Sequence, residues 1–200
     1  MGMASAICNM ADIYKQDEDY KKAEELFTEG LAVFRETGHI SGVAEVLLSL
    51  GEIRKIKGDL SKAKDFFDEA LSIQEKIANE RGIAKALIAL GEVYYETKDY
   101  KKAQEYLYKS LRRAAKLKAT GLIAITLADV TKCLLSSGQE ELAYEVITFV
   151  SPELIDDERM KKEVKEITKQ IESKLTKQNI DNISKKAKTK KLEDILKIIK

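Results

Sequence analysis

The sequence repeats itself every 40 residues, and this period constrains the fold more than any other feature. Alanine recurs at this spacing four times and aspartate three times, at Ala23, Ala63, Ala103 and Ala143 and at Asp19, Asp59 and Asp99. Residues 40–79 and 80–119 are identical at eleven of forty positions. A fixed period of this length indicates a stack of similar supersecondary units, each contacting only its neighbours.

Each period has the pattern of two helices joined by a short turn. In residues 80–119 the apolar residues form two faces, separated by a break. The face before the break consists of Ile83, Leu87, Leu90, Val93 and Tyr94, and the face after it consists of Ala103, Leu107 and Leu111. This spacing is typical of amphipathic helices. Gly58 and Gly138 can adopt the left-handed conformation that ends a helix, and Asp19, Asp59 and Asp99 can each cap the helix that follows. No alternating pattern indicates a strand, so the sequence predicts an all-α fold.

Small residues at fixed offsets predict close packing inside each pair of helices. Gly51 and Gly91 lie in the middle of first helices, and alanine begins each second helix. We expect Ala63 to face Gly51, because two small residues let helix backbones approach closely.

These residues resemble the tetratricopeptide repeat (TPR) family. Its signature places large apolar residues, a Gly or Ala and a Tyr on the first helix, and Ala and Phe on the second. The third repeat carries it as Leu87, Leu90, Gly91, Tyr94, Ala103 and Leu107, and the second as Leu47, Leu50, Gly51, Arg54, Ala63 and Phe67. The resemblance implies an α-solenoid, a right-handed superhelix of stacked antiparallel helix hairpins.

Two departures distinguish this array from the usual TPR pattern. The family's period is 34 residues, and the proline that ends its second helix is absent here, which lets that helix extend by about one turn. Arrays with this longer period resemble those of kinesin light chains and peptide-responsive bacterial regulators. HEAT and armadillo arrays also have a period near 40, but the small residues here lie at TPR offsets.

The sequence divides into three parts. Residues 2–150 form four repeats, at about 2–39, 40–79, 80–119 and 120–150, of which the last is degenerate. Residues 152–175, beginning at Pro152, have the polar pattern of a C-terminal capping helix. Residues 176–200 read as a flexible basic linker followed by a short amphipathic helix. Residues 151–200 carry 14 Lys and Arg against 10 Asp and Glu, whereas residues 1–150 carry 21 against 24.

The sequence offers little for catalysis. The only histidine, His39, lies in a turn between repeats, and no phosphate-binding loop, nucleophile elbow or paired-cysteine motif is present. Cys8 and Cys133 belong to distant repeats, so we expect neither a disulfide nor a shared metal. The sequence therefore predicts a non-enzymatic protein without cofactor or metal. Two cysteines and no span of apolar residues fit a cytoplasmic location.

The TPR resemblance implies that the first helices line a concave groove that binds a peptide or partner helix. The groove-facing offsets in this sequence are Cys8, Leu48, Ile88 and Ala128, then Asp12, Glu52, Glu92 and Lys132, then Lys15, Lys55, Tyr95 and Leu135. Three of these are carboxylates in one row, beside an apolar strip. Such a groove favours a protein or peptide with basic and apolar residues, as the scaffold or sensor part of a regulatory system.

Other readings of the same residues stay open. The three carboxylates can instead be ordinary surface groups paired with Lys15, Lys55 or Lys85. The lysine-rich segment from Lys185 to Lys191 can attract nucleic acid, although it has no aromatic residue and no binding motif, so a solvated linker is favoured. The chain can also self-associate, either through its uncapped first repeat or through the apolar stripe of residues 192–199.

Overall fold

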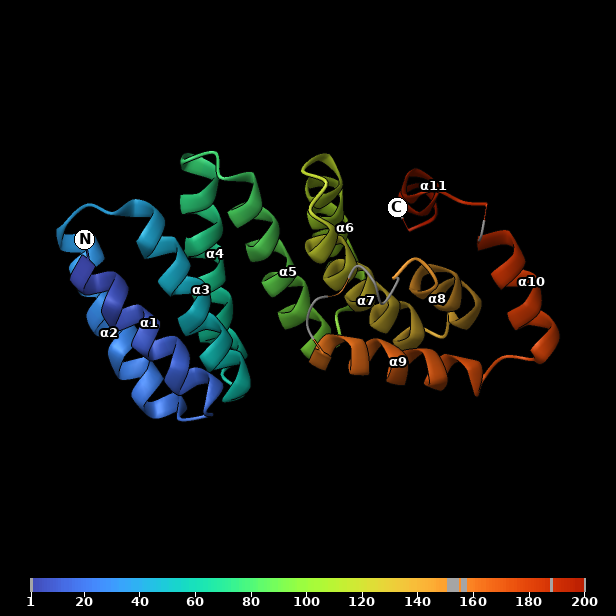
Figure 1. Ribbon diagram of the computed structural model, residues 1–200, viewed down its shortest axis with the longest axis horizontal. Helices are drawn as coiled ribbons and strands as arrows, with labels where there is room; N and C mark the ends of the chain where they lie inside the picture. The colour runs from blue at the N-terminus through green and yellow to red at the C-terminus, as the bar shows by residue number, and fades with distance from the viewer. Residues whose placement is uncertain (1, 151–154, 156–157, 188, 200) are drawn as a thin grey trace. The chain divides into compact units, whose positions relative to one another are not determined.

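The structure is a computed structural model that describes residues 2–150, 155, 158–187 and 189–199. Over these residues the chain is all-α and forms eleven helices, most of them in antiparallel pairs (Figure 1). The predicted fold class is confirmed. The chain divides into two compact units, residues 1–93 and residues 94–200.

The N-terminal unit is regular. It contains α1 (Gly2–Gln16), α2 (Tyr20–Glu36), α3 (Ile40–Ile56), α4 (Leu60–Lys76) and α5 (Glu80–Glu96) as far as Val93. Helices α2 to α5 have 17 residues each. The second helices are thus long, as expected when no proline ends them. In this unit α1 packs on α2, α2 on α3 and α3 on α4.

One turn geometry recurs every 20 residues, within repeats and between them. The backbone φ is positive at Gly38, Gly58 and Gly138, and equally at Glu18, Ala78, Lys98 and Lys118. At each of these turns the amide that follows the positive-φ residue donates to the carbonyl five residues earlier, as the Asp59 amide does to the Arg54 carbonyl at 2.9 Å. This bond satisfies a carbonyl that would otherwise be unpaired at the helix end.

The residue after each turn caps the next helix. Carboxylate oxygens of Asp19, Asp59 and Asp99 accept from the backbone amides three residues later, as the sequence predicted. His39 does the same for α3, because its Nδ1 accepts from the Gly42 amide at 3.0 Å. The His39 ring also stacks on Phe34, with 5.0 Å between ring centroids. The single histidine therefore has a structural role.

Position 51 requires glycine because an aromatic ring packs directly against its backbone. A Cβ at Gly51 would lie 2.3 Å from a ring carbon of Phe67, which is fully buried. The expectation that Ala63 faces Gly51 is therefore incomplete, because the closest neighbour is the Phe67 ring. The missing side chain makes space for a large residue of the paired helix.

The C-terminal unit departs from this regularity. It contains the end of α5, α6 (Tyr100–Lys116), α7 (Thr120–Ser136), the short α8 (Glu140–Ile147), α9 (Glu158–Glu172), α10 (Lys177–Ala187) and α11 (Leu192–Ile198). Helix α9 contacts α7 and α8, α10 contacts α8, and α11 contacts α6. The last repeat is thus closed by three additional helices.

Where a flexible linker was predicted, the structure has a helix. Helix α10 spans 11 residues of the lysine-rich segment, and Ile180 and Ile183 pack against the core of this unit. Thr176 caps it, because its Oγ1 accepts from the Asn179 amide at 3.2 Å. Two isoleucines on one face provide enough apolar surface to hold a short helix in place. Pro152, at which the capping helix was expected to begin, lies outside the described residues.

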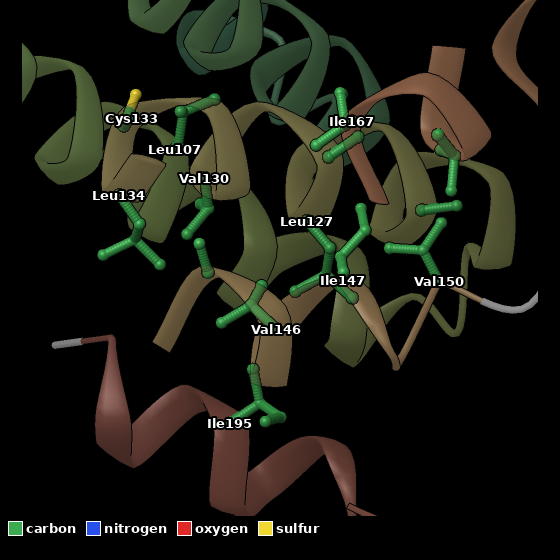
Figure 2. Close-up of a cluster of buried hydrophobic side chains, with 14 of the residues drawn as sticks. Leu107, Leu127, Val130, Cys133, Leu134, Val146, Ile147, Val150, Ile167 and Ile195 are labelled. Carbon is green, nitrogen blue, oxygen red and sulfur yellow. The ribbon is translucent and has the colours of Figure 1, made fainter. Parts of the chain in front are cut away.

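Helix α11 completes the core of the C-terminal unit. Ile195 is fully buried and reaches toward Val146 of α8, in the cluster that also contains Leu127 and Ile147 (Figure 2). Leu192, Leu196 and Ile199 pack around the same cluster. The apolar stripe at residues 192–199 is therefore used within the chain.

Candidate partner-binding face

Two of the predicted groove residues line an open cleft in the N-terminal unit. The cleft has a volume of about 230 Å³, and Cys8 and Asp12 contribute to it from α1. Helix α3 adds Glu45 and Val46, and the aromatic ring of Phe34 reaches it from α2. Two carboxylates therefore lie at the rim of a cavity whose floor is partly apolar.

The thiol of Cys8 is affected both by burial and by the carboxylates of this cleft. Burial raises the pKa of Cys8 to about 11, and the nearby carboxylates of Asp12 and Glu45 contribute further to the increase. A negative field disfavours the thiolate, for the same reason that it favours a bound cation. The cleft is thus suited to positively charged groups.

The predicted row of carboxylates is paired with lysines along the first helices. The Nζ of Lys15 lies 2.8 Å from a carboxylate oxygen of Glu52 and 3.5 Å from one of Asp12. Lys55 pairs with Glu92 in the same manner. Burial alone would lower the pKa of Lys15, but the two carboxylates outweigh it and hold that pKa above its ordinary value. The row is therefore an alternation of charges.

The predicted apolar strip is only partly accessible. Cys8 and Leu48 are half-buried, whereas Ile88 and Ala128 are buried. The exposed apolar surface of this strip is thus concentrated near α1 and α3.

A second cleft lies in the C-terminal unit and has a different chemistry. It has a volume of about 340 Å³ and is lined by Tyr95, Lys132 and Leu135 together with Ile167 and Lys174 from the region of α9. The hydroxyl of Tyr95 also shares a hydrogen bond of 3.2 Å with Ser136. Two lysines face this cleft, so it lacks the acidic character of the first.

Lys132 is held by carboxylates from two helices. Its Nζ lies 2.9 Å from Asp129 and 2.5 Å from Glu163 of α9. Burial alone would lower the pKa of Lys132, but these carboxylates outweigh burial and raise the pKa above its ordinary value. In the N-terminal unit a lysine bridges to the next first helix, and here α9 provides the partner instead.

The basic tail is partly neutralised by the same unit. Lys190 pairs with Glu145 of α8, and Lys185, Lys186 and Lys191 are exposed. Lys188 lies outside the described residues. No helix in the described part of the chain is long and apolar enough to cross a membrane. Over the same residues, no group of three or more His, Cys, Asp or Glu side chains is placed to hold a metal ion.

The sequence analysis missed two acidic residues of these sites, Glu45 and Glu163. Glu45 precedes Leu48 by three residues and Glu52 by seven, so helical spacing alone places it on the predicted face. No pattern in the sequence indicated Glu163, because its contact with Lys132 depends on how α9 packs against α7.

Comparisons with known proteins agree with this architecture. Family models described as tetratricopeptide repeat match residues 2–76 and residues 84–117, which together span more than half of the chain. The chain belongs to the tetratricopeptide repeat family. Among curated proteins, none matches the sequence.

Solved TPR structures share the fold at low sequence identity. The nearly identical TPR-like repeats of a Podosopora anserina protein, described as a kinesin light chain, match with a TM-score of 0.67 and 15% identity over 92% of each chain. BtubC (BKLC) from P. vanneervenii matches with a TM-score of 0.70 and 16% identity, over 94% of this chain and 79% of its own. The apo form of RapI matches with a TM-score of 0.73 and 20% identity, over 90% of this chain and 51% of its own. The chain thus spans about half the length of RapI.

Membership of the TPR family supports a role in protein interaction. TPR arrays are typically non-catalytic scaffolds that bind other proteins. The fold thus gives the class of function, and the clefts described above provide candidate contact surfaces.

Proposed function

We propose that this TPR protein is a non-enzymatic interaction module that holds a peptide or partner helix against its first helices. The observation that carries the proposal is the cleft between α1 and α3, where Asp12 and Glu45 accompany an apolar floor. Its preferred ligand has basic and apolar side chains. Of the predicted groove residues, the accessible ones in the N-terminal unit belong to the proposed surface, with Cys8 and Asp12 at its centre.

The cleft has the chemistry that a long basic side chain requires. Lysine and arginine bury an apolar stem and keep the charged group at a polar rim. Phe34 and Val46 provide surface for the stem, and the carboxylates of Asp12 and Glu45 attract the charge. The raised pKa of Cys8 supports this assignment, since the same carboxylates contribute to it.

The lysine–carboxylate pairs allow a ligand to exchange partners. Lys15 and Glu52 keep 23% and 47% of their side-chain surface exposed. Pairs of this kind contribute about 0–1 kcal/mol, so a ligand cation can replace Lys15 at Glu52 at little cost. We infer that Glu52 and Glu92 extend the acidic contact surface once a basic ligand is bound.

The wider role that we propose is that of a scaffold or sensor in a regulatory system of the cytoplasm. Two observations support it. TPR-like repeats with this fold occur in a protein described as a kinesin light chain. Cys8 and Cys133 are both unpaired, as expected in a reducing compartment.

Selection from a randomised peptide library with the full chain tests the binding mode. We expect the retained peptides to be enriched in Lys or Arg next to apolar residues. The double variant Asp12→Lys, Glu45→Lys should lose this binding, whereas a matched control, Glu25→Lys with Glu29→Lys on the exposed side of α2, should retain it. Enrichment of acidic peptides, or equal binding by both variants, would refute the proposal.

A further inference from the structure

Helix α6 differs in charge from the other long second helices of this chain. It carries six basic residues and one acidic residue, whereas α2 and α4 each carry three basic and four acidic residues. At one register position, Glu29 of α2 and Glu69 of α4 correspond to Lys109 of α6. The three helices have the same length and the same place in their repeats, so the repeat pattern itself does not require this charge.

The basic residues of α6 lie on one side of the helix. Because successive residues are turned by about 100°, these side chains fall within an arc of about 120°. The opposite side is buried, and Leu107 and Leu111 are fully covered there. At a rise of 1.5 Å per residue, the basic side runs for about 22 Å along the helix axis. This side is called here the α6 basic stripe, and its members are Lys101, Lys102, Lys109, Arg112, Arg113 and Lys116.

Every exposed residue of α6, a helix that is described throughout, is charged. The centre of a protein–protein interface is apolar and depleted in lysine, and α6 exposes no apolar side chain that could form such a centre. Surfaces that bind nucleic acid are more polar and much more positively charged. The exposed residues are Lys101, Lys102, Glu105, Lys109, Arg112 and Lys116.

Carboxylates neutralise little of the α6 basic stripe. In α2 the guanidinium of Arg35 lies 2.8 Å from a carboxylate oxygen of Glu69. In the stripe, the Nζ of Lys102 lies 3.5 Å from a carboxylate oxygen of Asp99. Within the described part of the chain, four further members take part in no ion pair, namely Lys101, Lys109, Arg112 and Lys116.

Two of these cations rest on tyrosine rings instead. The Nζ of Lys109 lies 5.2 Å from the centroid of the Tyr106 ring. The Cζ of Arg112 lies 5.9 Å from the centroid of the Tyr108 ring. An aromatic ring attracts a cation and holds it in place without cancelling its charge. The centre of the stripe is therefore ordered and still positive.

The stripe fits a ligand with closely spaced negative charges and no positive ones. Helices α2 and α4 of a second copy of this chain mix both signs, and Glu24 and Glu69 are already paired within the chain. A nucleic acid carries one phosphate per nucleotide along its backbone. Charge complementarity therefore favours a nucleic acid over a second copy.

We propose that the α6 basic stripe binds the phosphate backbone of a nucleic acid. Its ammonium and guanidinium groups neutralise phosphates and release bound counterions, so the affinity falls steeply as salt rises. Phosphate contacts carry no sequence information, so binding does not depend on the bases. The stripe lies on a second helix, apart from the cleft between α1 and α3, and it does not rest on the peptide-binding function proposed above.

Fluorescence anisotropy with the full chain and two labelled single-stranded DNAs of 20 nucleotides and unrelated sequence tests the proposal. If about four phosphates are neutralised, the affinity should fall about 50-fold between 50 and 200 mM salt, because log K changes with log salt by about −0.7 per phosphate. The two sequences should bind equally. Absence of binding at 50 mM salt, or an affinity that does not change with salt, would overturn the proposal.

The double variant Lys109→Gln, Arg112→Gln removes two charges from the centre of the stripe. It should weaken binding about tenfold or more at 50 mM salt and reduce the salt slope by about 1.4, the share of two phosphates. A matched control, Lys185→Gln with Lys186→Gln, removes two exposed charges from α10 and should bind as the unchanged chain does. Equal losses in the two variants would overturn the proposal, because binding would then follow net charge alone.

A labelled peptide of 20 glutamates separates a nucleic acid from an acidic protein segment as the ligand. It should bind about tenfold or more weakly than the DNAs at 50 mM salt. The half-buried rings of Tyr106 and Tyr108 offer contacts to sugars and bases that a glutamate chain cannot use. Equal or tighter binding of the peptide would assign the stripe to an acidic protein and overturn the proposal.

Discussion

The two units of this TPR protein treat the ends of their helix stacks in opposite ways. In the N-terminal unit the repeat pattern includes α1, and the side of α1 that carries Met10 is exposed to solvent, with Met10 itself 50% exposed. The C-terminal unit shortens its last second helix, α8, to eight residues. Helices α9 and α10 contact α8, and α11 contacts α6. The C-terminal unit thus closes its helix stack with additional helices of this chain.

The comparison also separates two kinds of lysine–carboxylate pairing. In the N-terminal unit, Lys15 and Lys55 each join one first helix to the next. In the C-terminal unit, Lys132 joins α7 to the closing helix α9 through Glu163. The C-terminal unit is therefore closed by the same kind of lysine–carboxylate pair that links successive first helices in the N-terminal unit.

The largest expected effect is at the closing helices. Ile195→Ala should lower the free energy of unfolding by about 2–4 kcal/mol, because Ile195 is fully buried against the core of the C-terminal unit. Ile198→Ala in the same helix should change it by less than about 0.5 kcal/mol, since Ile198 is 37% exposed. Urea unfolding of both variants measures this. Equal effects would show that α11 does not close the unit.

The next largest effect on stability is expected from replacing one glycine in each unit by alanine. Gly51→Ala should destabilise by about 1–3 kcal/mol, because its new methyl group would collide with the Phe67 ring. Gly121→Ala should stabilise by up to about 1 kcal/mol, since nothing lies within 4 Å and alanine favours the helix. Thermal unfolding compares the two. A neutral Gly51→Ala would contradict the packing between α3 and α4.

Replacing the histidine cap should have a smaller effect. His39→Ala should cost about 1 kcal/mol, because the Gly42 amide loses its acceptor. His39→Asn should restore most of this, since Asn79 caps the following repeat in the same way, with its Oδ1 accepting from the Gly82 amide at 3.2 Å. Thermal unfolding of both variants checks the prediction. Failure of asparagine to rescue would assign the cost to the lost stacking on Phe34.

The cysteines of the two units should differ in reactivity without a change in stability. Only the thiolate reacts with iodoacetamide, and the pKa of Cys8 is raised to about 11. Its alkylation should therefore be slow at pH 8 and rise about tenfold per pH unit until about pH 11. Asp12→Asn should speed it, because a charge that raises the pKa is removed. Cys133, fully buried and with a pKa of about 12, should stay unreactive while the chain is folded. Fast alkylation of Cys8 at pH 8 would contradict the burial of this thiol beside the carboxylates, and an unchanged rate in Asp12→Asn would contradict the effect of the nearby charge.

Much of the fold followed from the 40-residue period, because its helix breaks carry their own chemistry. Asp19, Asp59 and Asp99 could be recognised as caps from their side chains alone. The identical turns at Glu18 and Lys98 could not be recognised, since nothing in these residues favours a positive φ; the packing of the flanking helices imposes it.

The candidate site could be predicted only in part. Helical periodicity placed Cys8 and Asp12 on the face that forms the cleft. It could not decide whether Glu52 was free or paired with Lys15, because that depends on the distance between two helices. The helix α10 was missed because its two isoleucines are stabilised by contacts with another element, and such contacts leave no local pattern.

Hydrogen exchange of the full chain, with and without a peptide selected for binding, tests the central claim most directly. If the cleft between α1 and α3 binds the peptide, amides in both residues 2–16 and residues 40–56 should exchange more slowly when it is bound. Protection confined to residues 177–199, or to the exposed sides of α2 and α4, would show that the chain recognises its partner elsewhere.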